Sequence, residues 1–447
     1  MAPRVSSRGM TTFTIVWLGQ AVSLVGSGLT SFALGVWTFQ RTGSATQFAL
    51  IGLCAVLPRV VLSPFAGVVV DRWDRRWVMI AGDAGAGLST LMVVLLIFSG
   101  RLETWHIYLL TAANAAFGTV QWPAFMAVTS LLVPKEHLGR ANGLAQFGQA
   151  ASEILAPALA GVLVGTIQLK GVILIDVATF FFAVVTLLLV RLPRPEPVLD
   201  STPKQESLWH NLTFGWKYII ARPGLMGLLA FLAVVNFLWG MVGATITPMI
   251  LSWTSSDVLG YIISIAGIGM LTGSLVMSVW GGPQRRIQGV LYGELLSGLC
   301  FVLIGLRPSF WPVALGVFGS HLSIAIVYGS NQSIWQAKVE PDVQGRVFAT
   351  QQMVARAAAP LAYLLAGPLA DRVFNPLLAA SGPLVNNVGQ ILGSGPGRGI
   401  GLIFVIMGLA KVAVTLVARS NPHVRDIEDE LPDATLSLSD PFFCTDA

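Results

Sequence analysis

The chain has 447 residues, of which 54% are hydrophobic and only 11% are charged, and its mean hydropathy is +0.72. Soluble domains carry roughly a quarter charged residues, so this composition excludes an ordinary water-soluble domain and indicates a membrane protein surrounded by lipid. The net charge of +5 does not require a nucleic-acid partner, because excess Lys and Arg marks the cytoplasmic loops of membrane proteins.

Apolar runs that are long enough to cross a bilayer occur in two groups of six. A span needs about 20 residues, and the opening segment 1–12 lacks the short apolar core of a cleavable secretory signal. The first group is predicted over residues 13–39, 46–70, 78–99, 106–133, 143–166 and 171–190. The second group is predicted over residues 224–251, 258–280, 288–306, 311–337, 347–370 and 400–418. We therefore predict an all-α membrane protein with 12 transmembrane helices in two six-helix bundles.

The distribution of basic residues predicts the orientation of these spans. With the amino terminus inside, 18 of the 27 Lys and Arg residues fall in cytoplasmic segments and 6 fall outside. This asymmetry follows the positive-inside rule for an even number of helices. Both termini are expected to be cytoplasmic.

The segments outside the bundles differ from one another in composition. The sequence "RLPRPEP" from Arg191 is followed by Leu208, Leu212, Trp216 and Ile219 at helical spacing, which predicts a linker that ends in an interfacial helix. The residues after Asn421 are polar and acidic, and we expect a solvated tail. The predicted organisation is a first bundle over 1–190, a cytoplasmic linker over 191–222, a second bundle over 223–420 and an acidic cytoplasmic tail over 421–447.

A weak internal repeat relates the two bundles. One offset of 206 residues pairs Gly67 with Gly273, Gly139-Arg140 with Gly345-Arg346, and Gly161 with Gly367. Parallel repeats about an axis along the membrane normal place a binding site between the two halves.

The most specific motif follows the second span. The sequence "GVVVDRWDRR", from Gly67 to Arg76, resembles the major facilitator loop signature Gly-x-x-x-Asp-Arg-x-x-Arg-Arg. The resemblance implies a gate in which Gly67 permits close helix approach and Asp71 meets a helix amino terminus or an Arg of the other half. The basic residues that we assign to this gate are Arg72, Arg75 and Arg76 of the motif, together with Arg140 and Arg346. The alternative is a basic stop-transfer loop without a gating role. The second half has Met277 in place of the acid, so any such gate is asymmetric.

Three further segments indicate which branch of this family the chain resembles. They are "WPAFMAVTSLLVPKEHLGRANGLAQ" (122–146), "GPLADRVF" (367–374) and "VRDIEDELPD" (424–433), which are similar to the branch containing macrolide exporters, the enterobactin exporter and the lysophospholipid flippase. This resemblance implies a monomeric secondary transporter of the bacterial inner membrane that exports amphiphilic small molecules, such as drugs, macrolides or siderophores, in exchange for protons. Proton coupling remains a hypothesis, because "APALAG" has Ala156 and Ala160 where the family's antiporter motif Gly-Pro-x-x-Gly-Gly has glycines. A lipid flippase of the same fold is the alternative.

Ionisable residues inside the spans are candidates for a transport site, because a charge at mid-bilayer costs at least a few kcal/mol. Helical rise places Arg59, Glu153 and Arg356 near mid-membrane, on helices that face the boundary between halves in the family fold. Glu153 is the candidate proton-binding carboxylate, and the two arginines are counter-charges or anchors for anionic substrates. Alternatively, the three groups only satisfy one another.

Polar and aromatic residues on the expected cavity helices complete the candidate site. They are Gln20, Asn114, Gln121, Trp122, Asn236 and Asn331. Other acids are assigned structural roles: Asp83 and Glu294 are expected to pack or pair with loops, and Asp176 is expected to cap a helix or meet interfacial water.

Other classes of function lack their signatures. The sequence has no phosphate-binding Gly-x-x-x-x-Gly-Lys-Ser/Thr loop, and Cys54, Cys300 and Cys444 are too scattered for a disulfide framework or a metal cluster. A membrane-embedded transferase using Asp71 and Asp74 would need clustered carboxylates, whereas these two alternate with arginines. We expect a transporter without cofactor or metal, and not an enzyme.

Overall fold

The computed structural model describes residues 6–133, 138–190, 208–340 and 343–431. At Gly67, Asp71, Arg72 and Arg140 the description covers the helix but not the side-chain environment. All the regular structure in the described residues is helical, as the apolar composition predicts.

The first half of the chain forms one group of packed helices. They are α1 (Ser6–Thr42), α2 (Ala45–Arg72), α3 (Arg75–Phe98), α4 (Thr104–Leu132) and α5 (Leu138–Leu189). The 52-residue α5 reverses at Gln168, where φ is 59° and ψ is 177°, so its two arms correspond to the fifth and sixth predicted spans.

The second half forms the other group. Its long helices are α7 (Pro223–Leu251), α8 (Ser256–Trp280), α9 (Arg286–Leu306), α10 (Phe310–Lys338), α11 (Gln344–Leu369) and α14 (Arg398–Ser420). A π-helical turn η3 (Ala370–Phe374) and the short helices α12 (Asn375–Leu377) and α13 (Val388–Leu392) connect α11 to α14. The helix predicted at the end of the linker is present as α6 (Leu208–Ile220).

Ten helices of the described part are long and apolar enough to cross a membrane. One of the ten is the two-armed α5, whereas the 29-residue α4 is not among them. The count of twelve crossings takes α5 as two spans and adds α4, and it stays a prediction.

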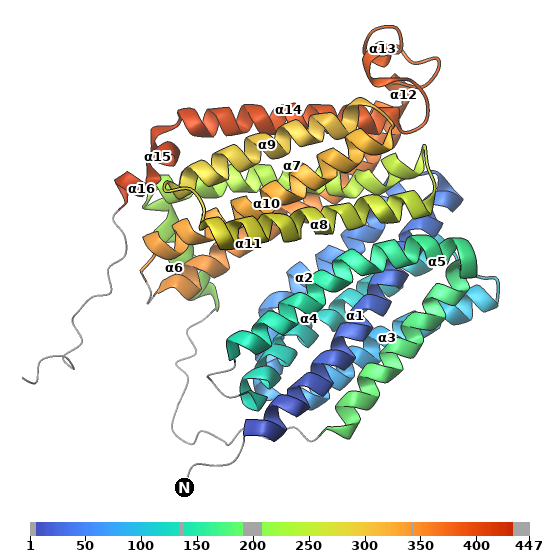
Figure 1. The fold of residues 1–447 in the computed structure, drawn as a ribbon, viewed down its shortest axis with the longest axis vertical. Coiled ribbons are helices and arrows are strands. Elements are labelled where there is room, and N and C mark those ends of the chain that lie inside the picture. Colours follow the sequence, from blue (N-terminus) through green and yellow to red (C-terminus); the bar gives the residue numbers. More distant parts are fainter. Residues whose placement is uncertain (1–5, 134–137, 191–207, 341–342, 432–447) are drawn as a thin grey trace, which may run out of the picture.

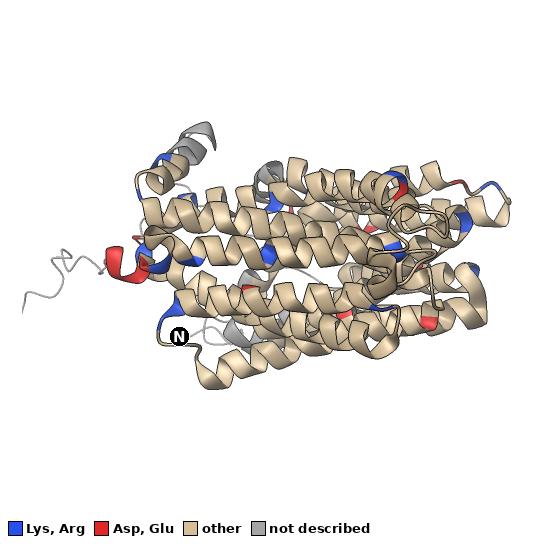
Figure 2. Cartoon of the chain, turned by 90° about the horizontal axis from the view of Figure 1, so that it is seen from above, with Lys and Arg blue, Asp and Glu red and all other residues tan. Residues whose placement is uncertain are grey.

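Apolar side chains cover much of the outer surface of both halves. Leu88, Leu189, Val279 and Val417 are between 64% and 82% exposed, which is the opposite of what a soluble protein would show. Figure 2 shows charged residues mainly toward the two ends of the helices, with few along the middle. The chain is therefore a multi-pass membrane protein with lipid-facing outer walls.

The two halves touch at one end of the molecule and separate at the other. Across the boundary, the first arm of α5 packs on α8, and α2 packs on α11. Figure 1 shows the halves together near α12 and α13, which we call the closed end, and spread apart near the amino terminus, α6 and α16, which we call the open end.

The beginning of the acidic tail differs from our expectation of a solvated segment. Residues Pro422–Arg425 (α15) and Ile427–Glu430 (α16) pack against α7 and α9, and the side chains of Val424 and Ile427 are 2% and 0% exposed. The Glu428 carboxylate accepts a hydrogen bond of 3.0 Å from Ile287 N at the start of α9, where unpaired backbone N–H groups attract an anion. Two apolar residues among the acids thus anchor the segment as far as residue 431.

Further contacts hold this segment at the open end. Lys338 Nζ donates to the carbonyl oxygen of Glu428 at 2.7 Å and also to that of Leu431. Arg285 lies 3.3 Å from Asp429, and the hydrogen bond from Arg425 lowers the pKa of Asp426. Residues 432–447, which complete the predicted tail, lie outside the described residues.

Candidate functional site

A cavity of about 500 Å³ lies in the first half and extends to the boundary with the second. Its walls come from α1, α2, α3, α4 and both arms of α5, and Arg356 of α11 contributes from the other half. A second cavity of about 270 Å³ shares Ser27, Thr90, Asn114 and Asp176 with the first and continues toward the closed end. The two cavities therefore meet around the Asp176 carboxylate.

Two carboxylates that we had assigned to structural roles line this cavity. Asp83 on α3 and Asp176 on the second arm of α5 are 2% and 3% exposed. Neither makes an ion pair with a Lys, Arg or His whose side chain the structure describes. Asp83 is packed inside the bundle, as one of our two alternatives for it had it, but it bonds to residues of helices and not of a loop. Asp176 bonds to side chains of α1 and α3 inside the bundle, so the expectation that it caps a helix or meets interfacial water is wrong.

Amide side chains of two other helices hold Asp83. Gln20 Nε2 of α1 donates to Asp83 Oδ2 at 2.8 Å, and Gln121 Nε2 of α4 donates to Asp83 Oδ1. Gln121 Nε2 also donates to Gln20 Oε1 at 2.7 Å. The carboxylate is thus bound by neutral donors only, in a cluster that joins α1, α3 and α4.

Hydroxyl groups surround Asp176. Ser27 Oγ of α1 lies 3.4 Å from Oδ1, and Thr90 Oγ1 of α3 lies 3.3 Å from Oδ2. Long hydrogen bonds from neutral hydroxyls compensate a buried negative charge only in part. Asp176 can therefore accept a proton or a positively charged group more readily than a carboxylate already paired with an arginine.

Helical periodicity explains why these side chains share one cavity. On α3, Asp83, Ala86, Gly87 and Thr90 all line it, at the spacing i, i+3, i+4 and i+7. Such spacing places residues on a single face of a helix. Here that face combines two small residues with the polar Asp83 and Thr90, in a helix that is mostly apolar after Arg76. The sequence carried this signal, which we did not use.

Most of the predicted cavity residues lie in the cavity. Six of the nine candidates line it, namely Gln20, Arg59, Asn114, Gln121, Trp122 and Arg356. Asn236 of α7 and Asn331 of α10 do not line it, and Asn331 accepts a hydrogen bond from Trp335 Nε1 at 3.1 Å. Glu153 is exposed, one turn beyond the cavity-lining Gln149, and is not among the lining residues.

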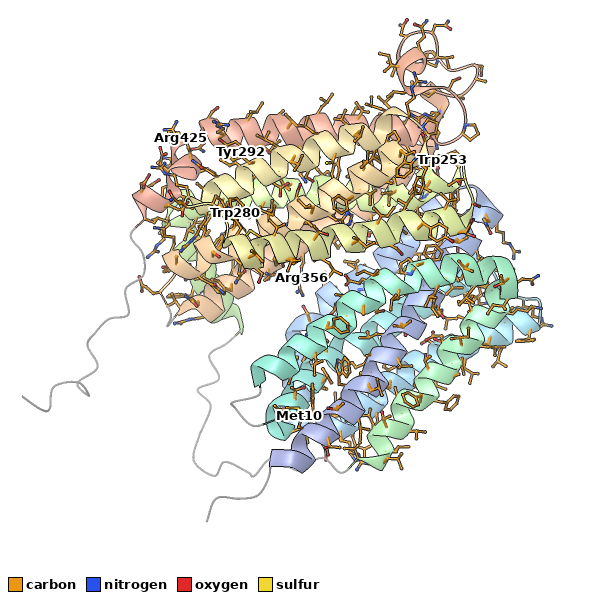
Figure 3. The ribbon with its side chains drawn as sticks, viewed as in Figure 1. Met10, Trp253, Trp280, Tyr292, Arg356 and Arg425 are labelled. Carbon is orange, nitrogen blue, oxygen red and sulfur yellow. The ribbon has the colours of Figure 1, made fainter. Side chains whose placement is uncertain are left out.

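The two arginines come from opposite halves. Arg59 lies on α2 and Arg356 on α11, the helix pair that crosses the boundary. Figure 3 shows Arg356 on the side of α11 that faces the first half. Neither forms an ion pair with a carboxylate of the described residues, so the interpretation that these arginines and Glu153 neutralise one another has no support in this conformation.

The predicted gating residues lie near the open end. Arg75 Nη1 donates to Ala127 O at 3.4 Å, and Arg76 Nη2 donates to Leu188 O at 2.8 Å. The Arg346 guanidinium lies 4.2 Å from the centre of the Phe214 ring in α6. The side chains of Gly67, Asp71, Arg72 and Arg140 fall outside the described part, so the gate stays a prediction.

Glycines bring the two halves into contact at the closed end. A Cβ atom on Gly161 of α5 would lie 3.3 Å from the Cα of Gly260 in α8, and one on Gly367 of α11 would lie 2.4 Å from the Cα of Thr46 in α2. Gly161 and Gly367 are a pair in the 206-residue repeat. Both members of the pair therefore permit close contact across the boundary.

The second half buries a different arrangement of charge. Lys411 Nζ of α14 lies 2.7 Å from Glu294 Oε2 of α9, and their side chains are 2% and 6% exposed. Ser297 Oγ accepts from the same Nζ at 2.8 Å, and the Trp239 and Phe301 rings pack over it. Buried charge is compensated here, whereas Asp83 and Asp176 in the first half form no ion pair with any cation among the described side chains. No group of three or more potential metal ligands occurs among the described residues.

Comparison with known proteins identifies the family. The sequence model of the Major Facilitator Superfamily matches residues 16–363, which is most of the chain. The chain belongs to the Major Facilitator Superfamily. The resemblance of the loop at residues 67–76 is thereby confirmed at the level of the family.

Characterised relatives of this transporter include exporters. Macrolide efflux protein A of Streptococcus pyogenes is 29% identical over 388 residues, covering 83% of this chain and 93% of that protein. Multidrug efflux pump Tap of Mycolicibacterium fortuitum is 24% identical over 358 residues, covering 77% and 86%. The branch suggested by the sequence motifs is thus represented among the relatives.

The fold of this transporter matches a solved structure of the same architecture. An inward-facing, unoccupied bacterial homolog of the human lysosomal transporter Spinster superposes with a TM-score of 0.72 at 13% identity, over 96% of this chain and 99% of that one. At this identity the likeness concerns the fold alone. It agrees with two halves that meet at one end and open at the other.

Proposed function

We propose that this transporter exports amphiphilic small molecules from the cytoplasm in exchange for protons, by alternating access of the central cavity. Membership of the Major Facilitator Superfamily and the relatives named for macrolide and multidrug efflux support export. The open end, which carries the amino terminus and the acidic segment, is the cytoplasmic end in this proposal, in line with the excess of basic residues there.

The observation that carries the proposal is the pair of buried carboxylates that form no ion pair with a described cationic side chain. Asp83 and Asp176 lie in one cavity, and the described partners are amides and hydroxyls. In such a setting the ionised form is the costly one, so a proton or a cationic group is bound favourably and released when water or a competing ligand enters. Exchange between proton and substrate at one site couples the two fluxes.

The remaining walls suit an amphiphile. Apolar and aromatic side chains such as Leu24, Trp122 and Phe180 line the same cavity as the carboxylates. Apolar surface supplies the affinity, and a few polar groups fix the orientation of the ligand. Arg59 and Arg356 at the boundary provide positive charge for an anionic group of the substrate.

The test is transport in proteoliposomes with an imposed pH gradient, with a macrolide as the probe. Uptake in the unmodified protein is expected to follow the gradient and to be accompanied by proton counterflow. Asp83→Asn or Asp176→Asn removes the titrating group but keeps its hydrogen-bond acceptor, so gradient-driven uptake should fall at least tenfold while downhill exchange of the macrolide persists.

Two matched variants sharpen this test. Glu103→Gln neutralises an exposed carboxylate that bonds only to Trp105 and His106 in its own half, and it should transport normally. Glu153→Gln tests the other candidate proton site. Loss of proton counterflow in Glu153→Gln with full coupling in both Asp variants would contradict our assignment. Gradient-independent movement of lysophospholipid, without any macrolide transport, would favour the flippase instead.

A further inference from the structure

The sequence Gly-x-x-x-Asp-Arg occurs twice, on two helices that pack against each other. One copy, Gly67 to Arg72, ends α2, and the other, Gly367 to Arg372, ends α11 and enters η3. The two helices run in opposite directions, so each copy lies at the end of the molecule where the partner helix begins. The major facilitator signature accounts for the first copy only.

The second copy is bound to the other half of the molecule. Asp371 Oδ2 accepts hydrogen bonds of 2.6 Å from Ser44 Oγ and 2.8 Å from Thr46 N, and Oδ1 accepts one of 3.1 Å from Ala45 N. Ser44 is the N-cap residue of α2. The carboxylate of the second half thus binds the amino terminus of a helix of the first.

Local structure brings Asp371 to this position. Gly367 lets α11 approach so closely that a Cβ there would lie 2.4 Å from Thr46 Cα. The π-helical turn at Ala370–Phe374 then inserts an extra residue into the helix, which changes the direction in which Asp371 projects. Gly399 of α14 packs directly on the Phe374 backbone and supports the turn.

The contact matters because it depends on the conformation. The first N–H groups of a helix have no partner within the helix and carry partial positive charge, so an anion placed there is stabilised. Three charge-assisted hydrogen bonds across the boundary favour the state in which this end is closed. All three must break before α2 and α11 can separate at this end.

We propose that Asp371 is the latch of the closed end. Its carboxylate holds the amino terminus of α2 while the end near α12 is closed, and it releases that terminus when α2 and α11 separate there.

The test measures the conformational equilibrium without substrate, so it does not depend on what the protein exports. Spin labels at Arg101 and Arg307, exposed on the two halves at the closed end, report their separation by double electron–electron resonance after the native cysteines are replaced. Asp371→Asn loses the charge, and the ratio of separated to closed populations should rise on the order of tenfold to a hundredfold.

Two more variants keep the result decisive. Ser44→Gly removes one donor to Asp371 but costs the helix only a few tenths of a kcal/mol as an N-cap, so a smaller shift in the same direction is expected. Glu103→Gln removes a carboxylate at the same end whose hydrogen bonds in the described part of the chain are to Trp105 and His106 of its own half, and it should change nothing. An unchanged distance distribution in Asp371→Asn, or an equal shift in Glu103→Gln, would overturn the proposal. Monodispersity by size-exclusion chromatography confirms that each variant is folded.

Discussion

Adding one methyl group at Gly367 should prevent the closed end from closing. An ideal Cβ there lies 2.4 Å from Thr46 Cα and 3.0 Å from Thr46 N, and both are backbone atoms that cannot rotate away. Reaching an ordinary contact distance requires the helices to separate by roughly 1 Å, at a cost typical of overpacking, about 1–3 kcal/mol. Only the closed conformation bears this cost. Gly367→Ala should therefore raise the population open at this end by roughly 5- to 150-fold.

The close contact between α5 and α8 at Gly161 allows a second, independent test of the same prediction. A Cβ on Gly161 would lie 2.7 Å from the carbonyl oxygen of Ser256, so Gly161→Ala should act in the same direction. Gly165, one turn further along the same arm of α5, has no atom within 4 Å of its Cβ position. Gly165→Ala is thus a matched control for the change in helix propensity.

The assay is labelling of a single cysteine from the closed end. Thr111, which lines the cavity of about 270 Å³ nearer that end, is replaced by cysteine in a chain lacking its native cysteines. A membrane-impermeant maleimide in oriented vesicles should react faster in Gly367→Ala and Gly161→Ala than in the parent. Equal labelling rates in Gly367→Ala and Gly165→Ala would show that the glycine contact does not control closure.

Two predictions concern stability. Glu294→Gln leaves the Lys411 ammonium buried without its counter-charge and should lower the free energy of unfolding by about 3–5 kcal/mol. The double variant Glu294→Leu with Lys411→Met should recover most of this loss. Unfolding in mixed detergent micelles measures both, and a single variant as stable as the double would contradict the interpretation. Ile427→Ala removes a fully buried side chain from the packed segment and should cost about 2–5 kcal/mol, while Asp426→Asn at the neighbouring, partly exposed position should cost much less. Equal melting temperatures for these two variants would mean that the segment does not contribute to the core.

Sequence reasoning predicted the spans and the helix in the linker because both follow from hydropathy and periodicity. Long apolar runs have no alternative in lipid but to form helices, so α7 to α11 begin and end near the predicted residues. The tail was different, because its acidic composition concealed Val424 and Ile427, whose helical spacing places both on the packed face. Average composition describes a segment poorly when two residues determine where it binds.

The candidate site was predicted in part, for a physical reason. Gln20, Gln121 and Asn114 lie in the cavity because a polar group inside an apolar helix requires a polar surrounding. Asp83 meets the same requirement, but we expected it only to pack or to pair with a loop and did not use the polar positions on the same face of α3. The Asp371 contact could not be predicted, because it depends on a π-helical turn and on close packing at Gly367.

The reversal at Gln168 has a mechanical consequence. A single residue with φ of 59° joins the two arms of α5, with no intervening loop to absorb movement. The first arm rests on α8 of the other half, and the second arm carries Asp176, eight residues or about 12 Å from the hinge point. Any tilt of the first arm as the halves rock must therefore displace this carboxylate. The distances between Asp176 and the hydroxyl groups around it then differ between the state open to one face of the membrane and the state open to the other.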